Sequence, residues 1–148
     1  MSHTATINSV VISDEHALRS TIIELKSHGI NCDLLENTVP RAYYDNQAGM
    51  EGKARFVVNL KDSKYDIGLY EREDGKGFEV RTDLYANQVN AVLGVKAQKG
   101  ETSEQAALGK LFQTYAIHAT TRAATQRGHR VNRVTKQDGT VQLQINVA

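Results

Sequence analysis

The stretch TSEQAALGKLFQTYAIHATTRAATQRG, residues 102–128, is the longest periodic segment of this chain, and it decides the fold. Its apolar side chains recur every three or four residues, as they do on one face of an α-helix. Thr102 followed by Gln105 predicts a capping box at its start, and Gly128 predicts its end. Such a helix spans roughly 37 Å, so we expect the end from Arg122 to Arg127 to extend past the covering strands into solvent. The residues of the apolar stripe are Leu108, Phe112, Tyr115, Ala119 and Ala123.

A second amphipathic helix is predicted near the N-terminus, over residues 14–28. Asp14 offers an oxygen that caps the first turn, and Gly29 is typical of a helix end. The flanking segments 4–12 and 30–34 have the β-branched, alternating composition of strands. The three elements together form a β-α-β unit, whose crossover is right-handed in nearly all proteins. The apolar residues of this helix are Leu18, Ile22 and Leu25.

Three antiparallel strands follow, and each alternates apolar with polar residues. A four-residue loop between the first two strands places Phe56 opposite Leu69, and Asn59 opposite Asp66 on the other face. A turn around Asp74-Gly75 leads to the third strand. We therefore expect one buried and one solvated face. The strands cover residues 54–60, 65–70 and 78–84.

Two segments are less regular. Residues 36–53 contain glycines and a proline around Tyr43 and Tyr44, which predicts a long loop. A tyrosine that fixes this loop to the core is the simpler interpretation of the pair, and a binding role is the alternative. Residues 86–101 fit either a short helix or a strand, followed by loop.

The last segment predicts a hairpin whose register depends on the turn. A two-residue turn would place Arg130 on the face of Val147 and bury its charge, which is costly. A three-residue loop with a left-handed Gly139 pairs Val131 with Ile145 instead. We therefore predict the three-residue loop, with Val131 buried and Arg130 exposed.

The element order is β-α-β-β-β-β-α-β-β, and each helix has one apolar stripe. This order favours the α+β class. We expect one domain over residues 1–148, built as a two-layer sandwich. A mainly antiparallel sheet would carry both helices on one face.

Composition excludes several classes of protein. The formal charge is +1, from 18 basic and 17 acidic residues, so the whole molecule has no general attraction to nucleic acid. One cysteine, Cys32, excludes an internal disulfide, and its alternation with Ile30 and Leu34 predicts a buried, inert thiol. No apolar run reaches the ~18 residues of a membrane helix, and no secretion signal is evident. These features favour a cytoplasmic protein that does not bind membranes.

No reaction centre is evident in the sequence. The five histidines are scattered, and no GxSxG, HExxH or GxGxxG motif occurs. Residues 94–102 come nearest to a phosphate-binding loop, but their glycine spacing is wrong and Glu101 occupies the lysine position, so an ordinary helix lead-in is the better interpretation. Little therefore supports an enzymatic activity, and we predict no cofactor and no metal.

Two sets of polar side chains are candidates for binding. The first is a basic segment at the end of the long helix and in the next strand, which has no carboxylate before Asp138 and is of a kind that holds phosphates. The second is the solvated sheet face, where Tyr70 could stack on a base. Plain solvated surface is the simpler interpretation of both. The basic segment comprises Arg122, Arg127, Arg130, Arg133 and Lys136, next to His129.

Three short motifs carry a resemblance to a known family. They are Ser2-His3-x-x-x-Ile7, Tyr65-Asp66-Ile67-Gly68-Leu69, and Tyr115-Ala116 with the later Gly128-His129-Arg130-Val131 and Asp138-Gly139-Thr140-Val141-x-Leu143. With them the chain resembles the hypothetical chloroplast open-reading-frame family numbered thirty-five. These small plastid and cyanobacterial proteins are classed as a domain of unknown function. The resemblance implies no established activity, and only that Ser2, His3, Asp66 and Gly68 belong to a shared feature.

The sequence as a whole favours a non-catalytic accessory protein that binds another protein. A nucleic-acid-binding module is the alternative, and it would use either the basic segment or the polar sheet face. The two differ in salt dependence, because binding to phosphates weakens steeply as salt rises.

Overall fold

The computed structural model describes residues 11–42 and 52–147, and its largest feature is a four-stranded antiparallel sheet. The strands are ordered as in the sequence, so each is hydrogen-bonded to the strand before it. Alternation of side chains gives the sheet one apolar face, on which Phe56, Ile67 and Leu69 are fully buried. The strands are β1 (Cys32–Thr38), β2 (Ala54–Leu60), β3 (Ile67–Glu71) and β4 (Phe78–Thr82).

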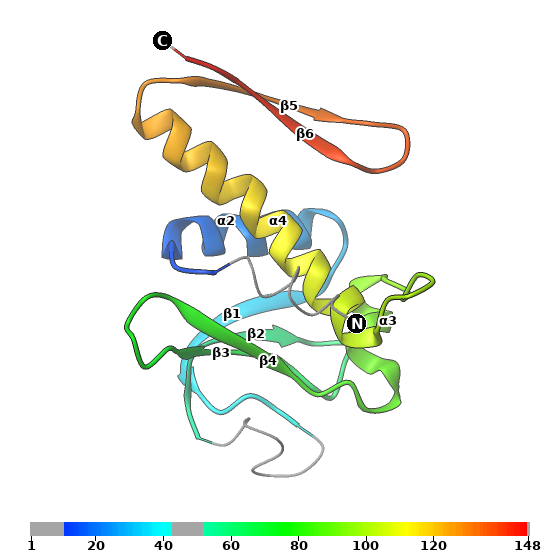
Figure 1. Ribbon diagram of the computed structural model, residues 1–148. Coiled ribbons are helices and arrows are strands. Elements are labelled where there is room, and N and C mark those ends of the chain that lie inside the picture. The colour runs from blue at the N-terminus through cyan, green and yellow to red at the C-terminus, as the bar shows by residue number, and fades with distance from the viewer. Residues whose placement is uncertain (1–10, 43–51, 148) are drawn as a thin grey trace.

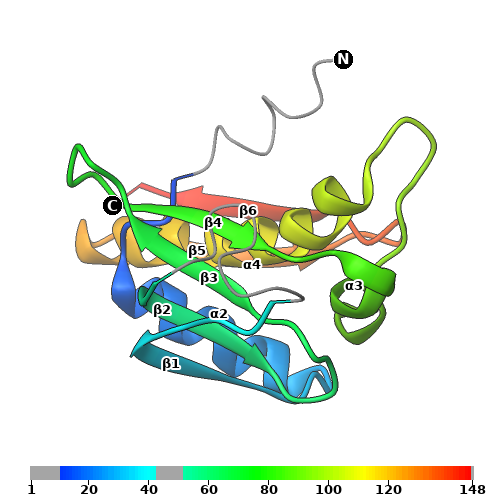
Figure 2. The same ribbon diagram turned by 90° about the horizontal axis from the view of Figure 1, so that it is seen from below.

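Two helices, α2 (Glu15–Ser27) and α4 (Ser103–Gln126), lie on one face of this sheet (Figure 1). Seen from below, the strands lie in front of both helices (Figure 2). The short α3 (Gln88–Leu93), which follows a 3-10 turn (Tyr85–Asn87), packs beside α4, and its Asn90 donates a hydrogen bond to the Ser103 carbonyl. The predicted α+β class, with helices on one face of an antiparallel sheet, is confirmed. The central core residues from the two helices include Leu18, Leu25, Leu111 and Phe112.

The predicted signals at both ends of α4 are confirmed. The Thr102 hydroxyl accepts a hydrogen bond from the Gln105 amide at 3.1 Å, and the Gln105 side-chain oxygen accepts one from the Thr102 amide at 2.7 Å. These two bonds form the capping box. At the other end Gly128 has a φ of +81°, and the His129 amide donates to the Ala124 carbonyl at 3.0 Å.

The predicted apolar stripe of α4 is buried in its first half only. Leu108, Phe112 and Tyr115 are buried, Ala119 is half-buried and Ala123 is exposed. The helix is covered on two sides, because the C-terminal strands lie across it on the side away from the sheet (Figure 1). The predicted solvation of its last turn is therefore only partly right. A second row of buried side chains comprises Leu111, Thr114, Ile117 and Ala124.

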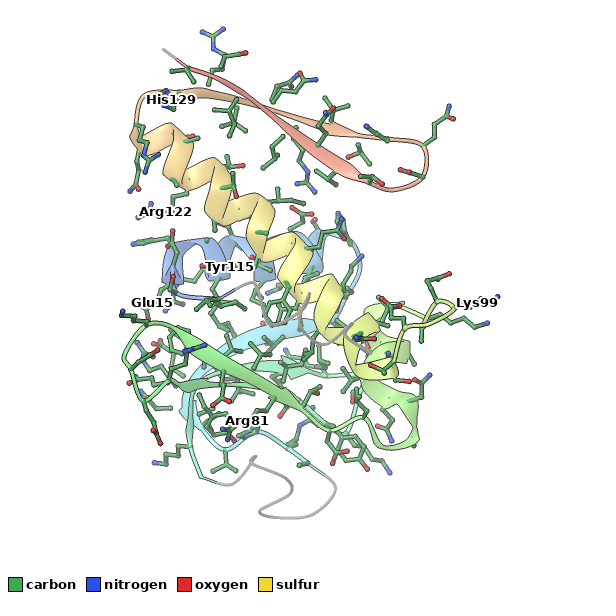
Figure 3. All side chains as sticks on the ribbon, in the orientation of Figure 1. Glu15, Arg81, Lys99, Tyr115, Arg122 and His129 are labelled. Atoms are coloured by element: carbon green, nitrogen blue, oxygen red, sulfur yellow. The ribbon has the colours of Figure 1, made fainter. Side chains whose placement is uncertain are left out.

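The start of α2 is fixed from two directions. Asp14 is its N-cap, and its Oδ1 accepts hydrogen bonds from the amides of His16 at 3.0 Å and Ala17 at 3.2 Å. From α4, the Tyr115 hydroxyl accepts the amides of Ser13 and Asp14 at 3.0 and 2.9 Å. Figure 3 shows Tyr115 on the side of α4 that faces α2. Tyr115 therefore combines a buried ring with a polar tip that orients the neighbouring helix.

The register of β2 and β3 is the predicted one. Phe56 pairs with Leu69, and the Asn59 side chain donates to Asp66 at 3.0 Å. The other face of these strands is not solvated as predicted, however, because Val57, Asp66 and Gly68 are buried. Pro40 and Arg41, which follow β1, lie against this face, Pro40 next to Gly68 and Arg41 bonded to Asp66. Asp83, within the third predicted strand at 78–84, is also buried.

The final hairpin consists of β5 (Arg130–Thr135) and β6 (Val141–Asn146). Val131 pairs with Ile145, and Gly139 has a φ of +88°, as the three-residue loop requires. The predicted register and the exposure of Arg130 are confirmed, whereas Val131 is half-buried rather than buried. The hairpin does not join the four-stranded sheet and forms a two-stranded sheet of its own. It adds a layer on the far side of the helices (Figure 1).

The remaining predictions concern the first strand, the two less regular segments and Cys32. Most of the strand predicted at 4–12 lies outside the described residues, although Ile12 forms an antiparallel bridge with Phe78. Within 86–101 the chain forms the short α3 and then a loop, and the 36–53 loop begins later than predicted because β1 extends to Thr38. Tyr43 and Tyr44 lie outside the described residues. Cys32 is buried as predicted, and burial raises the pKa of its thiol.

Candidate protein-interaction surface

The inner side of the C-terminal hairpin is apolar and incompletely covered. Alternation places Val131, Val141, Leu143 and Ile145 on the side that faces the helices. The first three are half-buried, and Ile145 is 41% exposed. In contrast, the inward residues of the two central strands of the four-stranded sheet, Phe56, Val58, Ile67 and Leu69, are fully buried. The hairpin thus leaves apolar surface available beyond what the helices cover.

A single carboxylate, Glu24, ties the hairpin to both helices. Arg133 of β5 donates from Nη1 and Nη2 to its two oxygens, each at 2.8 Å. His118 of α4 forms a hydrogen bond with Glu24 through Nε2 at 2.8 Å. The Glu24 side chain is only 12% exposed, and the hydrogen bond with Arg133, assisted by His118, lowers its pKa to about 2 against the opposing effect of burial. α2, α4 and β5, which lie far apart in the sequence, are therefore connected through the Glu24 carboxylate.

The outer edge of β6 has unpaired backbone groups. The Lys136 amide donates to the Thr140 carbonyl at 2.8 Å, which makes their pair a hydrogen-bonded one. Because bonded and non-bonded pairs alternate, Gln142 and Gln144 direct their backbone groups toward β5, and Leu143 directs its own outward. No strand pairs with this outer edge in the described part of the chain. The row of outward donors and acceptors belongs to Val141, Leu143 and Ile145.

The edge of β6 also lacks the residues that usually protect an edge strand. Its sequence from Val141 to Val147, VQLQINV, contains no charge, no proline and no glycine. Natural edge strands commonly carry lysine, proline or a bulge, which prevents pairing with another chain. β5, in comparison, carries Arg130 and Arg133. The two edges of the hairpin are therefore chemically different.

The arginines at positions 122 and 133 of the predicted basic segment are already paired. Arg122 Nε lies 2.9 Å from Oδ2 of Asp14, and Arg133 binds Glu24. Figure 3 shows Arg122 on α4 near the start of α2. The segment has no carboxylate before Asp138 in the sequence, but the fold brings two close to it, Asp14 at the N-cap of α2 and Glu24 within α2. Their charges are balanced locally rather than available for phosphates.

The remaining cations of that segment are exposed but spread out. Arg127, Arg130 and Lys136 form no ion pair within the described residues. Arg130 and Lys136 lie at opposite ends of β5, roughly 20 Å apart at 3.3 Å per residue. Both lie on the outer face of the hairpin, whereas Arg133 lies on the inner face. The structure does not gather the five residues into one patch.

A groove of about 730 Å³ lies between α2 and α4. It is open, and although most of its lining residues are polar, the surface they expose in it is mainly apolar. The two arginines in its lining, Arg19 and Arg122, have carboxylate partners, Glu36 and Asp14. Ile23 adds an exposed apolar side chain. Because its cations are paired, the groove has no strong attraction for a charged ligand. Its lining is His16, Arg19, Ser20, Ile23, His118, Thr121, Arg122, Thr125 and Gln126.

The ring of Tyr70, on the polar face of the sheet, is not freely accessible for stacking against a base. The Arg81 guanidinium lies over its ring, 4.8 Å from the centroid. The ring is half-buried and lies close to Gly68. Base stacking uses an accessible ring face, and here one face already holds a cation. Tyr70 is therefore part of the packing of the sheet.

Asp66 and Gly68, two of the four residues that the family resemblance singles out, hold Pro40 and Arg41 in place after β1. Asp66 is 2% exposed and accepts hydrogen bonds from the Arg41 amide at 2.9 Å and from Arg41 Nη2 at 2.8 Å. Pro40 packs on Gly68, where an added Cβ would lie 3.0 Å from its Cγ. This geometry indicates a structural role. Ser2 and His3 lie outside the described residues.

The roles of Glu24 and Arg41 in ion pairs were not predicted from the sequence. A signal for Glu24 was present, because the predicted register places Arg133 on the same face as Val131. An arginine in that position requires a carboxylate on the opposing layer. No comparable pattern marked Arg41, whose partner Asp66 lies 25 residues further along the chain.

Comparison with known proteins adds nothing to these observations. No family model matches the chain, and no curated protein or solved structure matches it with significance. Within the described residues, no group of three or more histidine, cysteine, aspartate or glutamate side chains is arranged to hold a metal ion. None of the described helices is long and apolar enough to cross a membrane.

Proposed function

We propose that this is a non-catalytic protein that binds a polypeptide strand along the outer edge of β6. The observation that carries the proposal is the combination of outward backbone donors and acceptors with an uncharged sequence from Val141 to Val147. Strand addition to such an edge gains main-chain hydrogen bonds, and alternate side chains supply specificity. An isolated two-stranded hairpin is marginally stable, so an added strand also strengthens the hairpin itself.

The inner face supports the same conclusion. A strand added to β6 would place every second side chain beside Leu143 and Ile145, which are incompletely covered. Apolar residues of the partner would therefore find apolar neighbours. The Glu24–Arg133 pair holds the hairpin against the helices, so the edge is presented in a fixed orientation.

The proposal is tested by capture from a native lysate, with and without nuclease, using the wild-type protein and Ile145→Pro. The Ile145 amide points outward, so proline there removes an edge donor without removing a β5–β6 hydrogen bond. We expect capture of a protein that survives nuclease and is lost with Ile145→Pro. Capture unaffected by Ile145→Pro would refute the proposed edge.

A nucleic-acid-binding role is a distinct outcome of the same experiment. Capture abolished by nuclease would favour it, and filter binding to single-stranded RNA and duplex DNA would measure it. Each phosphate contact contributes about 0.9 to the slope of log affinity against log salt for a duplex, and about 0.7 for a single strand. Arg127→Ala and Arg130→Ala would lower that slope. Because Arg122 and Arg133 are paired with carboxylates, we expect no binding by the wild-type protein.

A further inference from the structure

We infer that the strand received by β6 is β6 of a second copy of this chain, paired antiparallel around a two-fold axis at Gln144. This inference rests on the proposed function and names its partner. Antiparallel pairing around Gln144 brings Leu143 opposite Ile145 of the other copy, and Val141 opposite Val147. All four apolar residues then face apolar residues, so the sequence VQLQINV is complementary to itself.

The backbone geometry agrees with this register. The odd-numbered residues of β6 direct their amides and carbonyls outward, as the Lys136–Thr140 bond requires. In the proposed pairing, Leu143 and Ile145 are the residues that exchange hydrogen bonds. Gln144 then meets its symmetry mate at a non-bonded position, where the two Cα atoms of a pair lie about 4.5 Å apart.

Shifting the two-fold axis to a neighbouring apolar residue is less favourable. An axis at Leu143 leaves Val147 without a partner, and an axis at Ile145 leaves Val141 without one. Only the axis at Gln144 pairs every residue from Val141 to Val147. The polar residues then meet on the outer face, with Gln142 opposite Asn146 and Gln144 opposite itself, where amides can hydrogen-bond to each other.

The positive charges of β5 favour pairing through β6 instead, and they limit the assembly to two copies. Pairing β5 with itself would bring arginines together, and like charges on paired strands are destabilising. β6 has no charge, and the formal charge of +1 gives little repulsion between whole molecules. The resulting sheet β5-β6-β6-β5 has β5 at both edges, where the exposed Arg130 and the neighbouring Lys136 oppose further addition.

Cysteine crosslinking tests the pairing and its register. The native Cys32 is buried, so an introduced cysteine is the accessible one. A pair of Gln144→Cys residues across the axis lies within the about 4.4–6.8 Å between Cα atoms that a disulfide spans. We expect Gln144→Cys to form a covalent dimer under mild oxidation. Gln142→Cys is the matched control on the same face, because its symmetry mate lies roughly 13 Å away along the strand; preferential crosslinking of this control would refute the register.

Opposite charges at the axis give a second test that does not depend on disulfide chemistry. Sedimentation equilibrium should give the wild-type protein twice its chain mass of 16.4 kDa. Gln144→Lys alone and Gln144→Glu alone should be monomers, because like charges would meet at the axis. Their equimolar mixture should be a dimer. Circular dichroism of each variant checks that the exposed substitution leaves the fold intact.

The outcomes separate this inference from the proposed function. A monomeric wild-type protein over the whole concentration series would overturn the self-pairing, as would a mixture of the two charged variants that stays monomeric. If Ile145→Pro still abolishes capture of a different protein, the strand-binding function stands with another partner. If neither self-association nor capture depends on Ile145, both are refuted.

Discussion

The four-stranded sheet and the C-terminal hairpin are both antiparallel, but their apolar side chains are buried to different extents. In the sheet, Phe56, Val58 and Leu69 are fully buried beneath the helices. In the hairpin, Val131 is half-buried and Ile145 is 41% exposed. The sheet is held mainly by removal of apolar surface from water, whereas the hairpin depends on a turn, an ion pair and partial cover. Burial of apolar side chains thus stabilises the sheet more than the hairpin, and the hairpin is the region for which we propose recognition.

The largest effect should follow from Phe112→Ala, which removes a ring from the core between α4 and the sheet. Phe112 is 8% exposed, and such truncations cost roughly 3–5 kcal/mol. Urea unfolding measures the loss. Ile145→Ala is the matched control in the hairpin and should have a much smaller effect. Equal losses of unfolding free energy from the two substitutions would show that the sheet and the hairpin do not differ in their contribution to stability.

Acid should release the hairpin before it unfolds the sheet. The pKa of Glu24 is lowered from 4.5 to about 2, chiefly by Arg133. The ionised form therefore stabilises the fold above pH 4.5, and this contribution is lost as the pH falls toward 2. It amounts to at most about 3 kcal/mol.

The measurement is urea unfolding over a pH series, with Glu24→Gln as the control for all other carboxylates. The difference in unfolding free energy between the two proteins should shrink as the pH falls from 4.5 toward 2. Hydrogen exchange should show β5 and β6 opening first. A difference that does not change with pH would mean that the ion pair contributes nothing.

Gly139→Ala should weaken the hairpin through its turn alone. The glycine has a φ of +88°, which costs an L-residue roughly 1–2 kcal/mol, and an added Cβ would meet no other atom. We expect faster amide exchange in β5 and β6, with little change in the sheet. Loss of protection throughout the molecule would show that the hairpin and the sheet unfold as one unit.

The smallest effect should be a gain, from Gly109→Ala within α4. An added Cβ at this position has open space, and alanine is favoured over glycine inside a helix by about 0.5–1 kcal/mol. The urea midpoint should therefore rise. An unchanged or lower midpoint would indicate that the backbone at Gly109 needs the freedom of glycine.

Local patterns predicted the elements that depend on near neighbours. The capping box of α4 and the three-residue turn of the hairpin are set by residues three to five positions apart, so their register could be derived from sequence. The solvated face expected for β2 and β3 was wrong, because Pro40 and Arg41 approach it from a distant part of the chain. For the candidate site, the alternation of apolar and polar residues in β6 could be predicted from the sequence, whereas the lack of a pairing strand at its outer edge among the described residues could not.

The sequence by itself determined where α2 and α4 begin, which side chains share a face, and that the strand from Val141 to Val147 carries no charge. Tertiary structure alone decided that Asp14, the N-cap of α2, and Glu24 of α2 are the partners of Arg122 and Arg133, and that the last hairpin stands apart from the main sheet. The physical reason is the range of the interactions. Hydrogen bonds of turns and caps close within a few residues, whereas ion pairs and sheet edges depend on how elements pack in space.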